Sequence, residues 1–220
     1  MTGGSLDKYL REKKPSLETK LQFAKGAAKG LEYLHSRGVI HRDIAARNCL
    51  YDTNTKQVKI GDFRLSVHAK QYTSNNEKLP IKWLAVRPYL SLLRLLCLSV
   101  CLFQPEVLTS RVFTNKSDVY SFGVLLYEIF SNGMPPYHNR DTAWVQNHVI
   151  NGGKLTMPEG TPHYIQKIFE YCCVRNPLNR WDMKRVVEKM KIYIRSPTPQ
   201  TSAMKTANST ATARPRPPSH

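Results

Sequence analysis

The sequence predicts an α+β domain that is mainly α-helical and carries one small β-hairpin. Apolar residues recur at helical spacing after Pro15 and again after Ser117, so each run can bury one stripe. Two β-prone stretches, Cys49–Tyr51 and Val58–Ile60, flank the turn-rich segment DTNTK, which is typical of a hairpin. Residues 61–83 show little periodicity, and we expect a long polar loop there.

The expected helices begin and end at residues suited to those positions. Ser16 can cap the first long helix, because its hydroxyl can accept a backbone N–H, and Gly38 can end it. Gly133 stops the helix that starts at Ser117, and Asp182 can cap the last helix. Two further helices are expected over Asp141–Ile150 and Tyr164–Cys173.

Length and composition limit the class of protein. The 220 residues have room for one domain, 1–195, and a basic Ser/Thr/Pro-rich tail, 196–220, which we expect to be disordered because it buries little apolar surface. The formal charge of +17 suits acidic partners, but no RRM, zinc-finger or KH pattern favours nucleic-acid binding. Five cysteines, an odd number, without a signal peptide favour a reducing compartment, the cytoplasm.

Two polar motifs lie beside the expected hairpin. HRDIAARN occupies His41–Asn48, and GDFRLS occupies Gly61–Ser66. Together with PIKWLA at 80–85 and SDVYSFGVLLYEIFSNGMPPY at 117–137, they resemble the protein kinases, and specifically the protein-tyrosine kinases. The resemblance covers about residues 3–195 and implies the mainly helical C-terminal lobe of a kinase-like α+β fold. The NCL that follows the first motif resembles the Fes/Fer non-receptor group.

The resemblance implies ATP-dependent phosphoryl transfer to protein tyrosine. Such transfer depends on positioning and charge neutralisation more than on covalent help. Asp43 would accept the proton of the substrate hydroxyl or orient that hydroxyl, and Arg47 would help to place the tyrosine. Asn48 and Asp62 would supply hard oxygen ligands to Mg²⁺ that bridges the ATP phosphates. Leu50 would lie beneath the adenine.

The resemblance also implies residues for substrate binding, regulation and structure. Lys82 and Trp83 would line the ledge that binds a tyrosine-containing protein substrate. Tyr72 would be an activation-loop phosphosite, and its phosphate could pair with Arg42 and order the loop. The residues with an expected structural role are His41, Phe63, Asp118 and the buried ion pair of Glu106 with Arg180.

The small-lobe features of a kinase are not found in these 220 residues. They would be a Gly-rich loop, a strand lysine on the ATP phosphates and a helix glutamate that holds that lysine. MTGGSLDKYL at the start resembles instead the hinge and the first helix of the large lobe. Loss of phosphate orientation can raise a barrier by about 7–11 kcal/mol. We therefore expect this chain to be a weak or inactive kinase; the alternative is a non-catalytic module that binds peptides or a partner kinase.

The usual D-F-G motif reads D-F-R here, with Arg64 in place of glycine. Glycine permits backbone angles that a side chain resists. The new cation could compete with Mg²⁺ for Asp62, or it could swing outward into solvent. The sequence leaves both alternatives open.

An apolar insert interrupts the family pattern A-P-E. Nineteen residues, Val86–Gln104, separate Ala85 from Pro105. The apolar part, Tyr89–Phe103, is 15 residues long, whereas a membrane span needs about 20, and Arg94 lies near its middle. The sequence therefore predicts no stable membrane span.

The ends of the insert suggest its origin. Val-Arg can be encoded by GTAAGA, which resembles a splice donor, and Phe-Gln by TTTCAG, which resembles an acceptor. Nineteen codons make 57 nucleotides and keep the reading frame. We therefore interpret residues 86–104 as a retained intron. Translated, the insert separates Glu106 from Lys82 and Trp83 and adds apolar surface that favours association.

Overall fold

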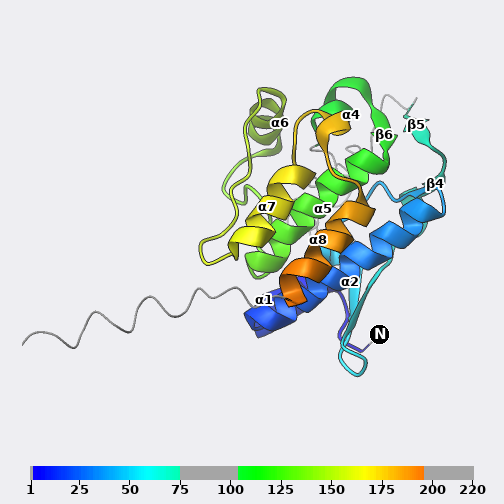
Figure 1. The fold of residues 1–220 in the computed structure, drawn as a ribbon. Helices are drawn as coiled ribbons and strands as arrows, with labels where there is room; N and C mark the ends of the chain where they lie inside the picture. Colours follow the sequence, from blue (N-terminus) through cyan, green and yellow to red (C-terminus); the bar gives the residue numbers. More distant parts are fainter. Residues whose placement is uncertain (1, 75–103, 196–220) are drawn as a thin grey trace, which may run out of the picture.

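The computed structural model describes residues 2–74 and 104–195. Within these ranges the chain forms a helical lobe with short antiparallel strands on one side of the helices (Figure 1). The prediction of a mainly helical α+β fold is confirmed. The predictions for Lys82, Trp83, the insert before Gln104 and the tail lie outside the described residues.

The elements follow in chain order. The helices are α1 (Leu6–Lys13), α2 (Leu17–Ser36), α4 (Pro105–Ser110), α5 (Asn115–Phe130), α6 (Thr142–Ile150), α7 (His163–Cys172) and α8 (Met183–Arg195). The strands are β1 (Val39–Ile40), β2 (Cys49–Asp52), β3 (Gln57–Ile60), β4 (Val67–His68), β5 (Gln71–Thr73) and β6 (Val112–Thr114). Short 3₁₀ turns are η1 (Ala46–Asn48), η2 (Phe63–Leu65) and η5 (Pro177–Asn179).

Helix α5 is the centre of the lobe, with α7 and α2 packed against it (Figure 1). The sequence predicted one buried stripe, but 13 of its 16 residues are buried. A helix that is apolar on all sides is buried on all sides. Gly123 allows α7 to approach, because a Cβ at this position would lie 3.1 Å from Cys172 Cβ.

The predicted helix caps are found, with one shift of boundary. Ser16 Oγ accepts a hydrogen bond from Thr19 N (3.4 Å) at the start of α2, and Asp182 Oδ1 accepts one from Arg185 N (2.8 Å) at the start of α8. Helix α5 begins at Asn115 rather than Ser117. The reason is a capping box, in which Thr114 is the N-cap and the predicted first residue is the third of the helix.

The hairpin of β2 and β3 is confirmed, with Leu50 opposite Lys59. The segment 61–83 differs from the expected loop, because its described part contains η2, β4 and β5. Strand β4 pairs with β1 and β5 pairs with β6, so each finds its partner at a distance along the chain. Such short strands depend on context and leave no periodic signal.

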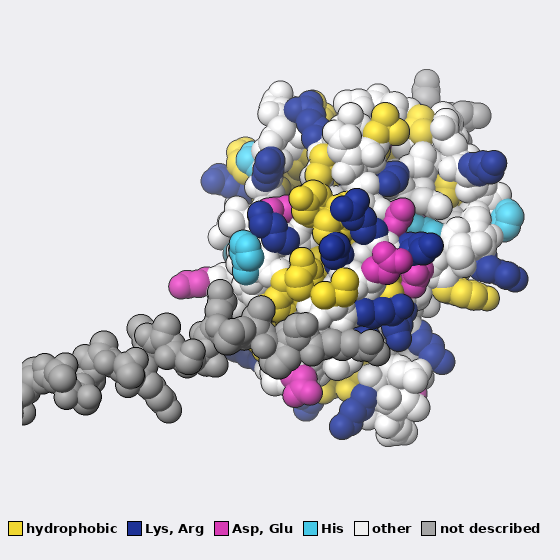
Figure 2. Space-filling model, viewed as in Figure 1, with side chains coloured by type: hydrophobic (Ala, Val, Ile, Leu, Met, Phe, Trp, Pro, Cys, Tyr) yellow, Lys and Arg dark blue, Asp and Glu magenta, His cyan; other side chains and the backbone are white. Residues whose placement is uncertain are grey.

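Two further expectations concern the positive charge of the surface and the membrane span. Lys and Arg side chains are spread over the face shown in Figure 2 rather than gathered in one patch. Over residues 2–74 and 104–195, no helix is both long and apolar enough to cross a lipid bilayer.

Candidate active site

The motif loop His41–Asn48 is fixed to the start of α5 by one buried carboxylate. Asp118, which is 1% exposed, accepts hydrogen bonds from the backbone N–H groups of His41 (2.7 Å) and Arg42 (2.9 Å). His35 Nε2 lies 3.2 Å from the same carboxylate. Arg42 has a φ of 69°, a left-handed conformation that a non-glycine residue holds only where its surroundings require it. Asp118 therefore defines the backbone of this loop.

His41 joins the motif loop to the second motif. Its Nε2 lies 3.0 Å from Gly61 O, and its Nδ1 lies 3.3 Å from Asp43 N. A carbonyl can only accept and a backbone N–H can only donate, so the ring carries its proton on Nε2. Phe63 packs edge-on against the ring, with 5.2 Å between the centroids. The buried imidazole thus holds the two motifs together.

Asp43 and Asn48 form the centre of the candidate site. Asp43 is 6% exposed, and Arg47 donates a hydrogen bond to its Oδ1. Asn48 Nδ2 donates to Asp43 Oδ2 (2.6 Å) and to Asp43 O (2.7 Å). The nitrogen end of the amide is thereby committed to Asp43, so its oxygen end is the one that can bind a cation.

Asp62 lies beside this centre at the end of β3. Gly61 N donates to Asn48 O (2.7 Å), which places the residue before Asp62 directly against the residue expected to share its cation. Asp62 has a φ of 59°, and Arg64 contacts its carboxylate. The hydrogen bonds from Arg64 lower the pKa of Asp62 below its ordinary value.

The donor set suits Mg²⁺. An amide oxygen and a carboxylate on adjacent chain segments are hard oxygen ligands, the kind that Mg²⁺ prefers. Asn48 and Asp62 are therefore the residues that could hold the metal. Leu50, expected beneath the adenine, lies on the same hairpin, is 38% exposed, and forms a β-bridge with Ser5.

The expected phosphosite and its arginine are in contact. The guanidinium of Arg42 lies 4.1 Å from the ring centroid of Tyr72 and 4.8 Å from that of Phe113. Tyr72 and Phe113 face each other across β5 and β6. Arg42 Nε is buried and has no hydrogen-bond acceptor among the described residues. The unmodified tyrosine thus meets this cation through its ring face.

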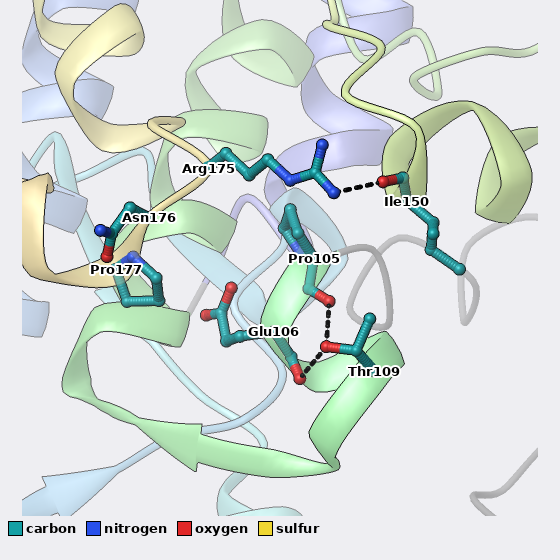
Figure 3. A pocket seen from close by; sticks show the side chains of 7 residues that line it. All are labelled: Pro105, Glu106, Thr109, Ile150, Arg175, Asn176 and Pro177. Atoms are coloured by element: carbon teal, nitrogen blue, oxygen red, sulfur yellow. Dashed lines mark hydrogen bonds between the residues drawn. The ribbon is translucent and has the colours of Figure 1, made fainter.

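Glu106 and Arg180 meet as the expected buried pair. Both guanidinium nitrogens NH1 and NH2 bind the carboxylate, at 2.6 and 2.7 Å, and Arg180 is 2% exposed. A pocket of about 380 Å³ opens beside Glu106 (Figure 3). Its lining residues are Pro105, Glu106, Thr109, Ile150, Arg175, Asn176 and Pro177, none of which belongs to the two motifs.

The sequence analysis missed a second support of the motif loop. Glu128 Oε2 accepts a hydrogen bond from Ala46 N (2.8 Å), ten residues along α5 from Asp118. Burial raises the pKa of Glu128 to about 7. The available signal was a single acid within the apolar run LLYEIF, since a buried carboxylate needs a partner.

Gln104, the last residue of the expected insert, is part of the core. It is 1% exposed, and its Nε2 donates to Ser121 Oγ (2.5 Å). Its Oε1 is buried and has no partner within residues 2–74 and 104–195. By the resemblance, alanine stands before the Pro-Glu pair, and alanine would bring no such unpaired atom.

Comparison with known proteins decides the family. The family model for the protein kinase domain matches residues 1–191. The chain belongs to the protein kinase family. It is 35% identical over 196 residues to Fer-related kinase 1 of Caenorhabditis elegans, and 34% identical over 196 residues to the megakaryocyte-associated tyrosine-protein kinase of Mus musculus. Each alignment covers 88% of this chain.

The relatives are longer than this chain. The alignments cover 45% of the nematode protein and 35% of the megakaryocyte-associated kinase. The leukocyte tyrosine kinase receptor of Mus musculus is 31% identical over 211 residues, which is 90% of this chain and 22% of the receptor. The resemblance to tyrosine kinases is confirmed, and this chain spans less than half the length of each of these relatives.

Proposed function

We propose that this chain is the C-terminal lobe of a protein-tyrosine kinase, the part that carries the catalytic and metal-binding residues. The observation that carries the proposal is the hydrogen-bonded pair of Asp43 and Asn48, held between a buried carboxylate and a hairpin. A structural loop would not need a carboxylate, an amide and a guanidinium to meet at one point. Phosphoryl transfer needs this arrangement, because it relies on positioned groups of fixed charge.

Each residue has a defined task. Asp43 accepts the proton of the substrate hydroxyl or orients it, while Arg47, bound to Oδ1, holds the carboxylate in place and helps to position the tyrosine. Asn48 and Asp62 would hold Mg²⁺, which supplies charge neutralisation to ATP phosphates when it is bound. Leu50 would lie under the adenine.

Substrate and regulatory roles complete the proposal. Lys82 and Trp83 would line the ledge for a tyrosine-containing protein substrate. Tyr72 would be phosphorylated, and the phosphate would then bind Arg42, whose buried Nε lacks an acceptor in the unmodified chain. The free thiols of Cys49, Cys172 and Cys173 support a reducing compartment, the cytoplasm.

These 220 residues should transfer phosphate weakly or not at all by themselves, because they contain no Gly-rich loop or strand lysine. The test is incubation of the full chain with labelled ATP, Mg²⁺ and a tyrosine peptide, with Asp43→Asn as the control. We expect equal, background incorporation from both. Clear transfer that disappears in Asp43→Asn would disprove inactivity and prove the phosphotransfer site.

Nucleotide binding tests the site independently of turnover. We expect Mg²⁺–ATP to raise the melting temperature of the chain, and Asn48→Ala to abolish the rise. The second candidate function is a non-catalytic interaction module, and the contact of Arg64 with Asp62 favours it. No stabilisation by Mg²⁺–ATP, together with stabilisation by a partner kinase or peptide, would decide for the module.

The origin of residues 86–104 has its own test. We propose that they are a retained intron. Sequencing of the transcript across Ala85–Pro105 should then show a dominant message without these codons. A dominant message that contains them would reject the proposal.

A further inference from the structure

Arg64 occupies both oxygens of the carboxylate expected to bind metal. Its Nε lies 2.7 Å from Asp62 Oδ1, and its NH2 lies 2.5 Å from Asp62 Oδ2. The backbone N of Arg64 is also directed at Oδ1, at 3.5 Å. A two-pronged contact of this kind is the strongest that arginine makes with a carboxylate. Of the two alternatives that the sequence left open, the structure adopts the contact with Asp62.

The backbone does not require glycine at this position. The positive φ in the motif belongs to Asp62, at 59°, a conformation that aspartate tolerates better than most residues. Arg64 lies in the 3₁₀ turn η2 and is not among the residues with positive φ. The replacement therefore acts through its side chain and not through backbone strain.

We propose that Arg64 is a built-in competitor of divalent cations at Asp62, so that a metal ion must displace the guanidinium before it can bind the carboxylate. The proposal rests on the proposed function, since it takes Asp62 as a metal ligand. The physical reason is that the guanidinium and the ion need the same lone pairs, and that two cations a few ångströms apart repel each other.

The competition is graded, because the contact of Arg64 with Asp62 is exposed to solvent. The side chain of Arg64 is 85% exposed and that of Asp62 is 26% exposed. The neighbouring pair of Arg47 with Asp43 is 16% and 8% exposed, so it is enclosed by the protein. Arg64 can therefore swing into solvent at small cost, and a sufficient concentration of metal ion displaces it.

The test measures metal binding directly, without turnover. The probe is Mn²⁺, which takes the same oxygen ligands as Mg²⁺, and its free fraction is read by electron paramagnetic resonance in the absence of nucleotide. The samples are the full chain, Arg64→Met, Asp62→Asn in the Arg64→Met background, and Lys59→Met. Lys59→Met removes one exposed positive charge from β3, the strand that precedes Asp62, and serves as the matched control.

We expect Arg64→Met to bind Mn²⁺ roughly twofold to fivefold more tightly than the unchanged chain, as loss of an exposed competing ion pair allows. Lys59→Met should change the affinity less than twofold, and Asp62→Asn should remove the gain. Equal affinity in Arg64→Met and the unchanged chain, with binding lost on Asp62→Asn, would overturn the competition but keep the metal site. An equal gain in Lys59→Met would overturn it as a general charge effect.

A third outcome separates the proposal from the function on which it rests. If Asp62→Asn leaves Mn²⁺ binding unchanged, the ion does not bind at Asp62. Both the metal site of the proposed function and the role of Arg64 would then be rejected. Circular dichroism and thermal melting of all four proteins show that each is folded, so that a loss of binding is not a loss of structure.

Discussion

Two aspartates of the site, Asp118 and Asp62, are held in opposite ways. Asp118 is 1% exposed and binds two backbone N–H groups and a histidine. Asp62 is 26% exposed at its side chain, and among the described residues its side-chain partner is the exposed Arg64. The first carboxylate is enclosed and already accepts three hydrogen bonds, whereas the second is exposed and can exchange its partner for another cation.

The difference teaches which charges define the fold and which remain available for chemistry. A buried carboxylate that loses its partners carries the full cost of desolvation, so it fixes the backbone around it. An exposed ion pair contributes little to stability and can be exchanged. Removal of a buried charge should therefore lower the stability of the fold, whereas removal of the exposed Asp62 should weaken ligand binding and leave stability nearly unchanged.

Among the buried charges, removal of Glu106 by Glu106→Ala should have the largest effect on stability. The variant leaves the guanidinium of Arg180 enclosed without its carboxylate, which should lower the free energy of unfolding by roughly 3–5 kcal/mol. Urea unfolding followed by circular dichroism measures it. Glu170→Ala is the matched control, because its pair with Lys167 is exposed, and the loss should stay below about 1 kcal/mol. Similar losses in both variants would refute the distinction.

Asp118→Ala should have the next largest effect. It leaves the N–H groups of His41 and Arg42 buried without acceptors, so we expect a loss of roughly 2–4 kcal/mol. The loop should also relax from its left-handed residue, which raises amide hydrogen exchange at residues 41–43. A stable variant with unchanged exchange would show that Asp118 does not define the loop.

The buried carboxylate of Glu128 should make the stability of the fold depend on pH. Burial raises its pKa in the folded chain to about 7, from 4.5 for the ordinary group. The folded state therefore binds more protons than the unfolded state between these values, and its stability falls as the pH rises from about 4.5 to about 7. We expect the chain to be about 1–3 kcal/mol more stable at pH 5 than at pH 7.5. Glu128→Gln should flatten this profile, measured by urea unfolding, and an unchanged slope would contradict the assignment.

Much of this contrast could be predicted from the sequence. The resemblance carried by HRDIAARN and GDFRLS implied the meeting of Asp43 with Asn48, and the caps at Ser16 and Asp182 predicted where helices begin. These features are local, because a loop or a cap is specified within a few residues. The resemblance supplied the distant pair of Glu106 with Arg180, which periodicity alone does not indicate.

The rest depends on contacts between distant segments. Strands β4 and β5 form only because β1 and β6 lie beside them. The support of Ala46 by Glu128 joins positions 82 residues apart, and the lone acid in LLYEIF indicates a need for a partner without indicating which one. The side chain of Arg64 can point toward Asp62 or into solvent, depending on its rotamer, and the sequence leaves both open. In the structure it extends from η2 to the carboxylate of Asp62.

The smallest expected effect on stability is the one that most sharpens the comparison. Asp62→Asn removes a carboxylate whose ion pair with Arg64 is exposed to solvent, so the midpoint of urea unfolding should not move measurably. The same change should abolish the stabilisation by Mg²⁺–ATP, because an amide is a far weaker ligand for Mg²⁺ than a carboxylate. If Asp62→Asn unfolds as readily as Asp118→Ala, Asp62 would instead be a residue that stabilises the fold. Stability and binding would then depend on the same charges, and the two aspartates would differ only in exposure.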